Sequence, residues 1–299
     1  MAVAAGCIVL LALVLDTNAI AAAITETTGW VLVAASFLML VGLPFAALRW
    51  HMILQNLGVT MPRAESLRIT CTSTMVALGL PSGQGGDIVR GVMLASRGNT
   101  RIETIVSSTI ADRVFGLLSM ALLALPGAII LATQIGGWVA ALCAGLLAVL
   151  LLLILGIGPL ERLLAWREGP IANRIKEGLA ELRKIFRQRS IAAWAIAYSL
   201  AVHGHAVLAA WLLGADLAIQ ATAWDYLALV PLIWVITMVP VSIGGIGVRE
   251  ASFALLFSGI GVPPEQGAAL GALVSVTSVL GVIAGGLLVL ILPRSAPPG

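Results

Sequence analysis

Two segments of the chain combine helix-breaking residues with a charged side chain suited to binding an anion. Residues 81–90 and 240–249 share the pattern Pro-x-x-x-Gly-Gly-x-x-Val-Arg, with corresponding residues 159 positions apart. The arginines that end the two copies, Arg90 and Arg249, carry N–H donors that match the oxygens of a phosphate or carboxylate. Chance repetition of common glycines is the alternative, but the shared Pro, Val and Arg favour an internal repeat. The residues expected to break the helices are Pro81, Gly85, Gly86, Pro240, Gly244, Gly245 and Gly247.

Acidic residues accompany both arginines, and a further acid and base follow the first copy. A charge inside a membrane costs roughly 2.5–3.5 kcal/mol on insertion scales, so several are expected only where they are paired or functional. The acids would balance the arginines or contact a cationic part of a ligand, and the alternative is a salt-bridge network that only holds the structure together. The residues expected to bind a substrate are Arg90, Arg249, Asp87, Glu250, Asp112 and Arg113.

Other kinds of site have less support in the sequence. His203 and His205 lie on different faces of a helix with no carboxylate or cysteine nearby, so we expect packed neutral histidines and no metal site. The glycines of residues 244–247 superficially resemble a nucleotide-binding loop, but no strand precedes them and no Lys-Ser/Thr follows. No Ser/His/Asp or Cys/His arrangement is visible. We therefore expect no catalytic residue, no metal and no cofactor.

The composition decides which kind of element positions these residues. Of the 299 residues, 60% are hydrophobic and 10% are charged, and the mean hydropathy is +1.06. A soluble fold is excluded, because water-soluble domains carry roughly a quarter charged residues. The net charge of +3 is too small and scattered to suggest a nucleic acid as partner. Long intervals without charge predict six membrane-spanning helices at about 1–23, 30–48, 104–126, 137–158, 190–215 and 266–293.

The two motif-bearing segments, about 66–98 and 226–262, do not fit this series of spans. Each is expected to enter the membrane, break at the Pro and the Gly pair, and return to the side from which it came. Basic residues flank the first segment, whereas Asp216 and Asp225 precede the second, so the two hairpins are expected to be inverted relative to each other. Broken backbone at that depth is tolerated only where it is buried in protein or lines a polar cavity.

The short helices that follow the breaks would direct their unpaired N–H groups into this cavity, with Arg90 and Arg249 in the first turns. That arrangement favours an anion. The sequence thus predicts an all-α polytopic integral membrane protein with about six transmembrane helices and two inverted re-entrant hairpins. Inverted repeats, broken helices and a midplane site together are typical of secondary transporters.

Basic residues predict the orientation. They concentrate in residues 49–103 and 159–190, whereas the connections at 16–29, 127–137 and 216–225 contain none. Because basic connections stay in the cytoplasm, both termini are expected there. The linker 159–190 has apolar residues every three or four positions, which predicts an amphipathic helix on the inner leaflet or, as the alternative, a solvated helix. Tryptophans near the span ends are expected at the membrane interfaces, namely Trp30, Trp50, Trp138, Trp194 and Trp224.

Four runs along the chain carry a family resemblance: Arg49-Trp50…Leu54…Gly58, Leu80-Pro81…Gly85-Gly86-Asp87…Arg90, Asp112-Arg113…Gly116-Leu117, and Pro240…Gly244-Gly245-Ile246-Gly247-Val248-Arg249-Glu250. In these runs the chain resembles the lysylphosphatidylglycerol synthase transmembrane-region family, flippase-like membrane proteins that include the flippase half of the bacterial multiple peptide resistance factor. The resemblance implies one flippase-like transmembrane domain over residues 1–299, with no synthase domain before the chain ends at Gly299. Asp112 departs from the pattern, since Glu is expected there more often, and the shorter acid predicts a weaker pairing with a nearby arginine.

Residues and resemblance together predict movement of an anionic phospholipid or lipid-linked headgroup across the bacterial cytoplasmic membrane. The expected partners are a membrane phospholipid or lipid-linked glycan, with a separate lipid-modifying enzyme and a homo-oligomer left open and no nucleic acid. Two alternatives remain at this point. One is a membrane-embedded transferase acting on a lipid substrate, and the other is a non-transporting scaffold that recruits a lipid-modifying enzyme through residues 159–190.

Overall fold

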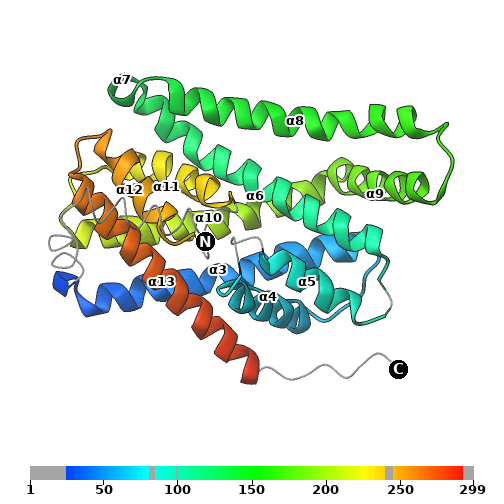
Figure 1. Ribbon diagram of the computed structural model, residues 1–299, viewed down its shortest axis with the longest axis horizontal. Coiled ribbons are helices and arrows are strands. Elements are labelled where there is room, and N and C mark those ends of the chain that lie inside the picture. Colours follow the sequence, from blue (N-terminus) through cyan, green and yellow to red (C-terminus); the bar gives the residue numbers. More distant parts are fainter. Residues whose placement is uncertain (1–24, 81–84, 99, 240–244, 292–299) are drawn as a thin grey trace.

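The described part of the chain is built from helices alone. The computed structural model describes residues 25–80, 85–98, 100–239 and 245–291, and contains no strand in those ranges (Figure 1). The predicted first span, 1–23, lies outside the described residues. The other five predicted spans are confirmed as helices long and apolar enough to cross a membrane: α3 (Gly29–Asn56), α6 (Ile102–Ile130), α8 (Trp138–Leu164), α10 (Arg189–Asp216) and α13 (Pro264–Ile291).

The motif-bearing segments form two pairs of short helices. The first pair is α4 (Arg63–Ala77) and α5 (Gly85–Ala95), and the second is α11 (Ala223–Thr237) and α12 (Val248–Ser258). Helices of 15 and 11 residues are about 22 and 16 Å long at 1.5 Å per residue, so none of the four spans about 30 Å of hydrocarbon. The predicted interruption of both segments is therefore observed, close to the expected bounds.

The repeat extends well beyond the motif. Helices α3 to α6 contain 28, 15, 11 and 29 residues, and helices α10 to α13 contain 28, 15, 11 and 28 in the same order. Between these two halves lie α7 (Ala132–Ile135), α8 and α9 (Pro170–Arg187). The chain thus contains two four-helix units joined by a separate connector.

The two halves run in opposite directions. The backbone N–H of Thr28, before α3, donates to the Asp216 carboxylate at the end of α10, over 2.8 Å. At the other end of the pair, the Asn56 amide donates to the Gln188 side chain. Helices α3 and α10 therefore lie side by side and antiparallel, and α4–α5 and α11–α12 enter the bundle from opposite ends (Figure 1).

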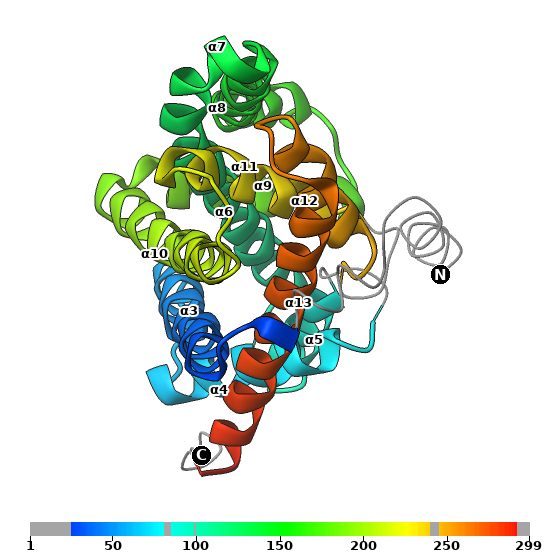
Figure 2. The ribbon, with the colours of Figure 1, turned by 90° about the vertical axis from the view of Figure 1, so that its left-hand side faces the viewer.

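One helix of each short pair packs against the other half. Helix α11 lies along α6, and α4 lies along α13 (Figure 2). Glycines allow the close approach. A Cβ at Gly127 of α6 would lie 2.9 Å from the backbone nitrogen of Ala228, and one at Gly286 of α13 would overlap Met75 of α4. The two halves are consequently intertwined and form one bundle.

Helix α9 confirms an amphipathic helix in the linker but differs from the expected position. Its residues Leu182 and Ile185 are buried against α6 and α8, while Ile171 and Ile175 are exposed. In Figure 1, α9 runs alongside α8 and does not lie flat across the end of the bundle. The inner part of its apolar face therefore packs against protein, because α8 extends to Leu164 and provides a partner surface.

Candidate functional site

A cavity of about 340 Å³ lies between the two halves. Residues of α3, α4, α5 and α6 line one part of it, and residues of α10, α11 and α12 line the rest. The second glycine of each motif, Gly86 and Gly245, borders the cavity, as do Arg90 and Arg249. Residues of both repeats therefore border the same cavity.

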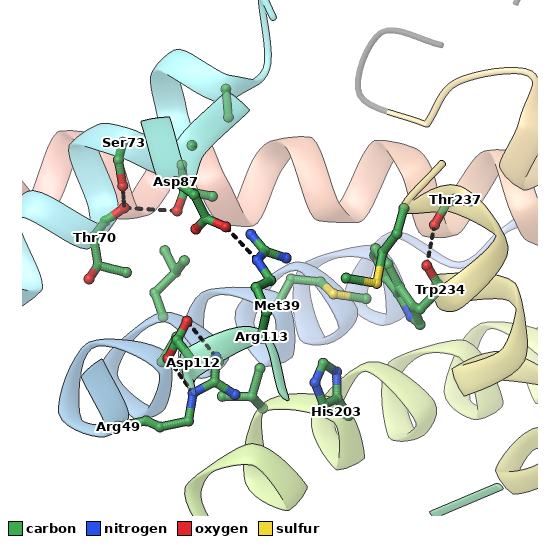
Figure 3. Close-up of a pocket in the computed structure, with 18 of the residues that line it drawn as sticks. Met39, Arg49, Thr70, Ser73, Asp87, Asp112, Arg113, His203, Trp234 and Thr237 are labelled. Carbon is green, nitrogen blue, oxygen red and sulfur yellow. Dashed lines mark hydrogen bonds and ion pairs between the residues drawn. The ribbon is translucent and has the colours of Figure 1, made fainter. Parts of the chain in front are cut away.

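In the first half, charged residues from three helices form a continuous chain of ion pairs. Arg49 of α3 donates from Nε and a terminal nitrogen to the two oxygens of Asp112 on α6, over 2.7 and 3.0 Å. Arg90 of α5 donates to Asp112 and to Asp87, each over 2.9 Å. Arg113 of α6 donates to the remaining oxygen of Asp87 (Figure 3). The pairs thus connect α3, α5 and α6 around the cavity.

Burial explains why these residues are held so closely. Arg90 is 5% exposed and Asp112 is 3% exposed. A single charge at such a position would carry a desolvation cost of several kcal/mol, which only a well-formed partner offsets. Weaker pairing was expected for Asp112 because its side chain is shorter than that of Glu. Asp112 nevertheless accepts three hydrogen bonds of 2.7–3.0 Å, because Arg49 and Arg90 reach it from two sides.

In the second half, Arg249 and Glu250 are held by hydrogen bonds to a serine hydroxyl and to the backbone, whereas the arginines of the first half are held by aspartates. Arg249 donates to the Ser275 hydroxyl over 3.1 Å, and that hydroxyl donates to Glu250. Glu250 also accepts from the backbone N–H of Gly247, over 2.5 Å, and so caps the start of α12. The φ of Gly247 is +83°, a left-handed value that favours glycine. Glu250 therefore positions α12 and does not border the cavity, in contrast to the expected binding role.

Each motif arginine also stacks on a tryptophan. The guanidinium carbon of Arg90 lies 4.7 Å from the centre of a Trp50 ring, and that of Arg249 lies 4.6 Å from a Trp234 ring. Such contacts are worth roughly 0.5–2 kcal/mol and fix the plane of the guanidinium. The expectation that Trp50 lies at a membrane interface is wrong, since it is 1% exposed beneath Arg90. Trp30, Trp138, Trp194 and Trp224 are exposed, as an interfacial position requires.

The structure adds Arg49, Trp50, Trp234, Ser199 and Ser275 to the predicted site. Arg49 also donates to the Ser199 hydroxyl of α10, over 2.8 Å. It was missed because the predicted span ended at residue 48, which placed Arg49 at the interface, whereas α3 continues to Asn56. The signal was present in the sequence, since Arg49-Trp50 is part of the family-like runs.

The break segments are partly described. Pro81, Pro240 and Gly244 lie outside the described residues. Gly85 and Gly86 were expected before the short helix, but they lie in the first turn of α5. Arg90 is therefore in the second turn of α5, whereas Arg249 is in the first turn of α12. A Cβ at Gly86 would lie 3.3 Å from the Ser73 carbonyl oxygen, so glycine lets α5 approach α4 closely.

The histidines differ in their surroundings. The His205 Nδ1 lies 3.1 Å from the Ala201 carbonyl oxygen, and its ring packs against Gly42. His203 points from α10 towards the centre of the cavity (Figure 3). Within residues 25–291, gaps excepted, no group of three His, Cys, Asp or Glu side chains could hold a metal ion.

The charges that border the cavity do not cancel. Among the described residues that border the cavity, four arginines (Arg49, Arg90, Arg113 and Arg249) face two aspartates (Asp87 and Asp112), an excess of two positive charges on its wall. Glu250, linked to Arg249 through the Ser275 hydroxyl, lies behind this wall. An arrangement of stacked and ion-paired guanidinium groups around a cavity of this size can hold a small anionic group.

Comparison with known families identifies the family of the chain. The family model described as "Lysylphosphatidylglycerol synthase TM region" matches residues 1–286. No curated protein matches the chain. Five helices among the described residues are long and apolar enough to span a membrane, and the match covers almost the whole chain, so this membrane protein belongs to the lysylphosphatidylglycerol synthase transmembrane-region family.

Proposed function

We propose that the protein moves an anionic phospholipid or lipid-linked headgroup between the leaflets of the bacterial cytoplasmic membrane, with the headgroup passing through the cavity. The observation that carries the proposal is the excess of two positive charges in a cavity bounded by both repeats. Charge buried between two inverted halves is costly and is expected where a substrate of opposite charge is bound. The family also supports a function that involves membrane lipids.

The short helices add to the attraction for an anion. Helix α12 begins at the cavity, next to Gly245 and Arg249. Helix α5 begins at Gly85, with Gly86 and Arg90 bordering the cavity. Both helices therefore direct the positive ends of their dipoles towards the same space. Since the Glu250 carboxylate already caps the start of α12, a phosphate there would receive its donors from the arginines.

The distribution of charge supports the orientation. Every described Lys or Arg that does not border the cavity falls within residues 63–101 or 162–189, and these segments share one end of the bundle (Figure 1). Under the positive-inside rule we propose that this end is cytoplasmic. Both termini would then be cytoplasmic if the predicted span 1–23, which lies outside the described residues, crosses the membrane. The two short pairs are then re-entrant from opposite sides. Rocking of one half against the other would expose the cavity to each leaflet in turn.

A transporter explains the site better than an enzyme does. Within the described residues, the carboxylates at the cavity are each held by two arginines, so that they stabilise positive charge and are not placed for proton transfer. The arginines themselves stay protonated. The proposal is therefore binding and translocation without chemical change of the lipid.

Leaflet exchange in proteoliposomes tests the proposal. Labelled phosphatidylglycerol is incorporated with the purified full chain, and its exchange is followed for the wild type and for Arg90→Ala/Arg249→Ala. The double variant keeps the Arg49–Asp112 and Arg113–Asp87 pairs, so neither aspartate loses every arginine. Arg101→Gln is the matched control, because Arg101 lies outside the cavity and is exposed.

The expected result is accelerated exchange for the wild type and the control, reduced at least about tenfold in the double variant. Circular dichroism and gel filtration establish that the double variant is folded. Equal exchange by the folded double variant would contradict the proposal. Absence of exchange with every anionic lipid would instead favour the scaffold, and α9 would then be the surface to delete.

A further inference from the structure

We infer that the cavity selects phosphate headgroups that carry no attached cation, and disfavours aminoacylated and zwitterionic phospholipids. The inference rests on the proposed function, since it concerns the ligand of the same cavity. It also separates this chain from what the family name suggests, because a lysyl group adds two ammonium groups to phosphatidylglycerol.

The first argument is the positive net charge of the described residues that border the cavity. Its described charged residues are Arg49, Arg90, Arg113 and Arg249 against Asp87 and Asp112. The histidines that border it, His203 and His205, are neutral or positive and can only increase the excess. An ammonium group brought into this space meets repulsion that a phosphate does not.

The second argument is that the carboxylate oxygens of Asp87 and Asp112 already accept hydrogen bonds from arginines. Asp112 accepts from Arg49 on both of its oxygens and from Arg90 on one of them. Asp87 accepts from Arg90 on one oxygen and from Arg113 on the other. A cationic headgroup would have to displace an arginine from one of these pairs. Breaking a buried pair is expensive, because it leaves the released charge without a partner.

Other acids near the cavity are equally engaged. Glu250 accepts from Ser275 and from the backbone of Gly247. Glu65 of α4 is paired with Arg68 and Arg97. The segments 81–84 and 240–244, which precede Gly86 and Gly245 in the chain, contain no Asp or Glu. Within the described residues, then, the cavity presents no carboxylate that is open to a cation.

Donors, in contrast, remain available to a phosphate. Arg113 has the most exposed side chain of the Asp-bound arginines at the cavity, at 34%. Thr70 of α4 borders the cavity and is buried, and its hydroxyl has no hydrogen-bond partner among the described residues. A buried hydroxyl without a partner costs about 1–3 kcal/mol, and a phosphate oxygen would satisfy it. The site therefore offers donors without offering acceptors.

Competitive lipid retention tests the inference. The purified full chain in detergent is mixed with equal amounts of phosphatidylglycerol, phosphatidic acid, phosphatidylethanolamine and lysylphosphatidylglycerol with matched acyl chains, and bound lipid is counted by native mass spectrometry. Phosphatidylglycerol and phosphatidic acid are expected to be retained at least about tenfold more than the two amine-bearing lipids. The comparison of the first two distinguishes a diester from a monoester phosphate.

Two variants sharpen the test. Arg113→Gln releases one oxygen of Asp87, so retention of the amine-bearing lipids should rise relative to phosphatidylglycerol. Thr70→Val keeps the shape of the side chain but removes the hydroxyl donor, so retention of the anionic lipids should fall severalfold while that of the amine-bearing lipids stays low. Arg101→Gln, outside the cavity, should match the wild type.

Equal or stronger retention of lysylphosphatidylglycerol by the wild type would overturn the inference. Its failure can be told apart from failure of the proposed function. Selective retention without leaflet exchange would sustain the inference and contradict translocation. Exchange of lysylphosphatidylglycerol as fast as that of phosphatidylglycerol would sustain translocation and contradict the inference.

Discussion

The two halves of the molecule hold equivalent helices by different forces. Helix α5 buries one large apolar side chain, Leu94, and it reaches α6 through the ion pairs of Arg90 and Asp87. Helix α12 buries Phe253, Leu256 and Phe257, and packs along α13. Charge thus positions the motif helix in the first half, and apolar packing positions it in the second.

This difference indicates which of the two motif helices is expected to move when a ligand binds. Apolar packing at close range has a single good arrangement, because interiors are as dense as organic crystals. The ion-paired residues of α5 border the cavity, so an anion bound there acts on them directly, whereas the buried phenylalanines of α12 do not border it. We therefore expect α5 to respond to the substrate and α12 to serve as the fixed side of the cavity.

The largest effect is expected from Asp112→Ala. This change leaves Arg49 and Arg90 buried with one acidic partner lost to each, and breaking a buried ion pair costs about 3–5 kcal/mol. The measurement is the midpoint of thermal unfolding in detergent, followed by gel filtration. A loss of stability no greater than that of Ser275→Ala would show that charge does not hold the first half.

An intermediate effect is expected where α12 meets α13. A Cβ at Gly271 would lie 2.8 Å from the Glu250 Cα, which is backbone and cannot yield easily. Gly271→Ala should therefore destabilise the protein by about 1–3 kcal/mol. The matched change in the first half is Gly91→Ala, whose Cβ would lie 3.1 Å from a methyl group of Ile105.

Because a side chain can adjust, Gly91→Ala should cost clearly less than Gly271→Ala in the same unfolding measurement. The reverse order would mean that α5 is the more rigidly packed helix. That outcome would remove the proposed division between a responsive side and a fixed side of the cavity.

The smallest effect is expected from Ser275→Ala. Its hydroxyl joins Arg249 to Glu250, and loss of a hydrogen bond of this kind costs about 0.5–1.5 kcal/mol. Arg249 stays stacked on Trp234, so anionic lipid retention should decrease only slightly. A collapse of retention would show that the second half depends on its polar contacts as much as the first half does.

Much of the fold followed from elementary features of the sequence. Charge-free intervals predicted five described spans, because hydrocarbon tolerates few charges, and the duplicated motif predicted the two interrupted segments. Arg90, Arg249, Asp87, Asp112 and Arg113 were also predicted and all border the cavity.

Pairing between distant residues could not be predicted in the same way. Arg49 and Asp112 are 63 positions apart, and nothing in their spacing shows that one arginine reaches both oxygens of the acid. The tryptophans were misjudged for a related reason. A tryptophan near the end of an apolar run suits an interface, and only the fold shows that Trp50 lies under Arg90.

Helix α8 determines how the two four-helix units are oriented relative to each other. Each four-helix unit begins and ends at the same end of the bundle, since its two long helices cross the molecule once in each direction and its short pair turns back (Figure 1). Two such units joined by a simple loop would point the same way. An odd number of added crossings turns the second unit over, and α8 supplies that crossing along the edge of the bundle. The two described units can therefore face each other within one polypeptide because a crossing helix joins them.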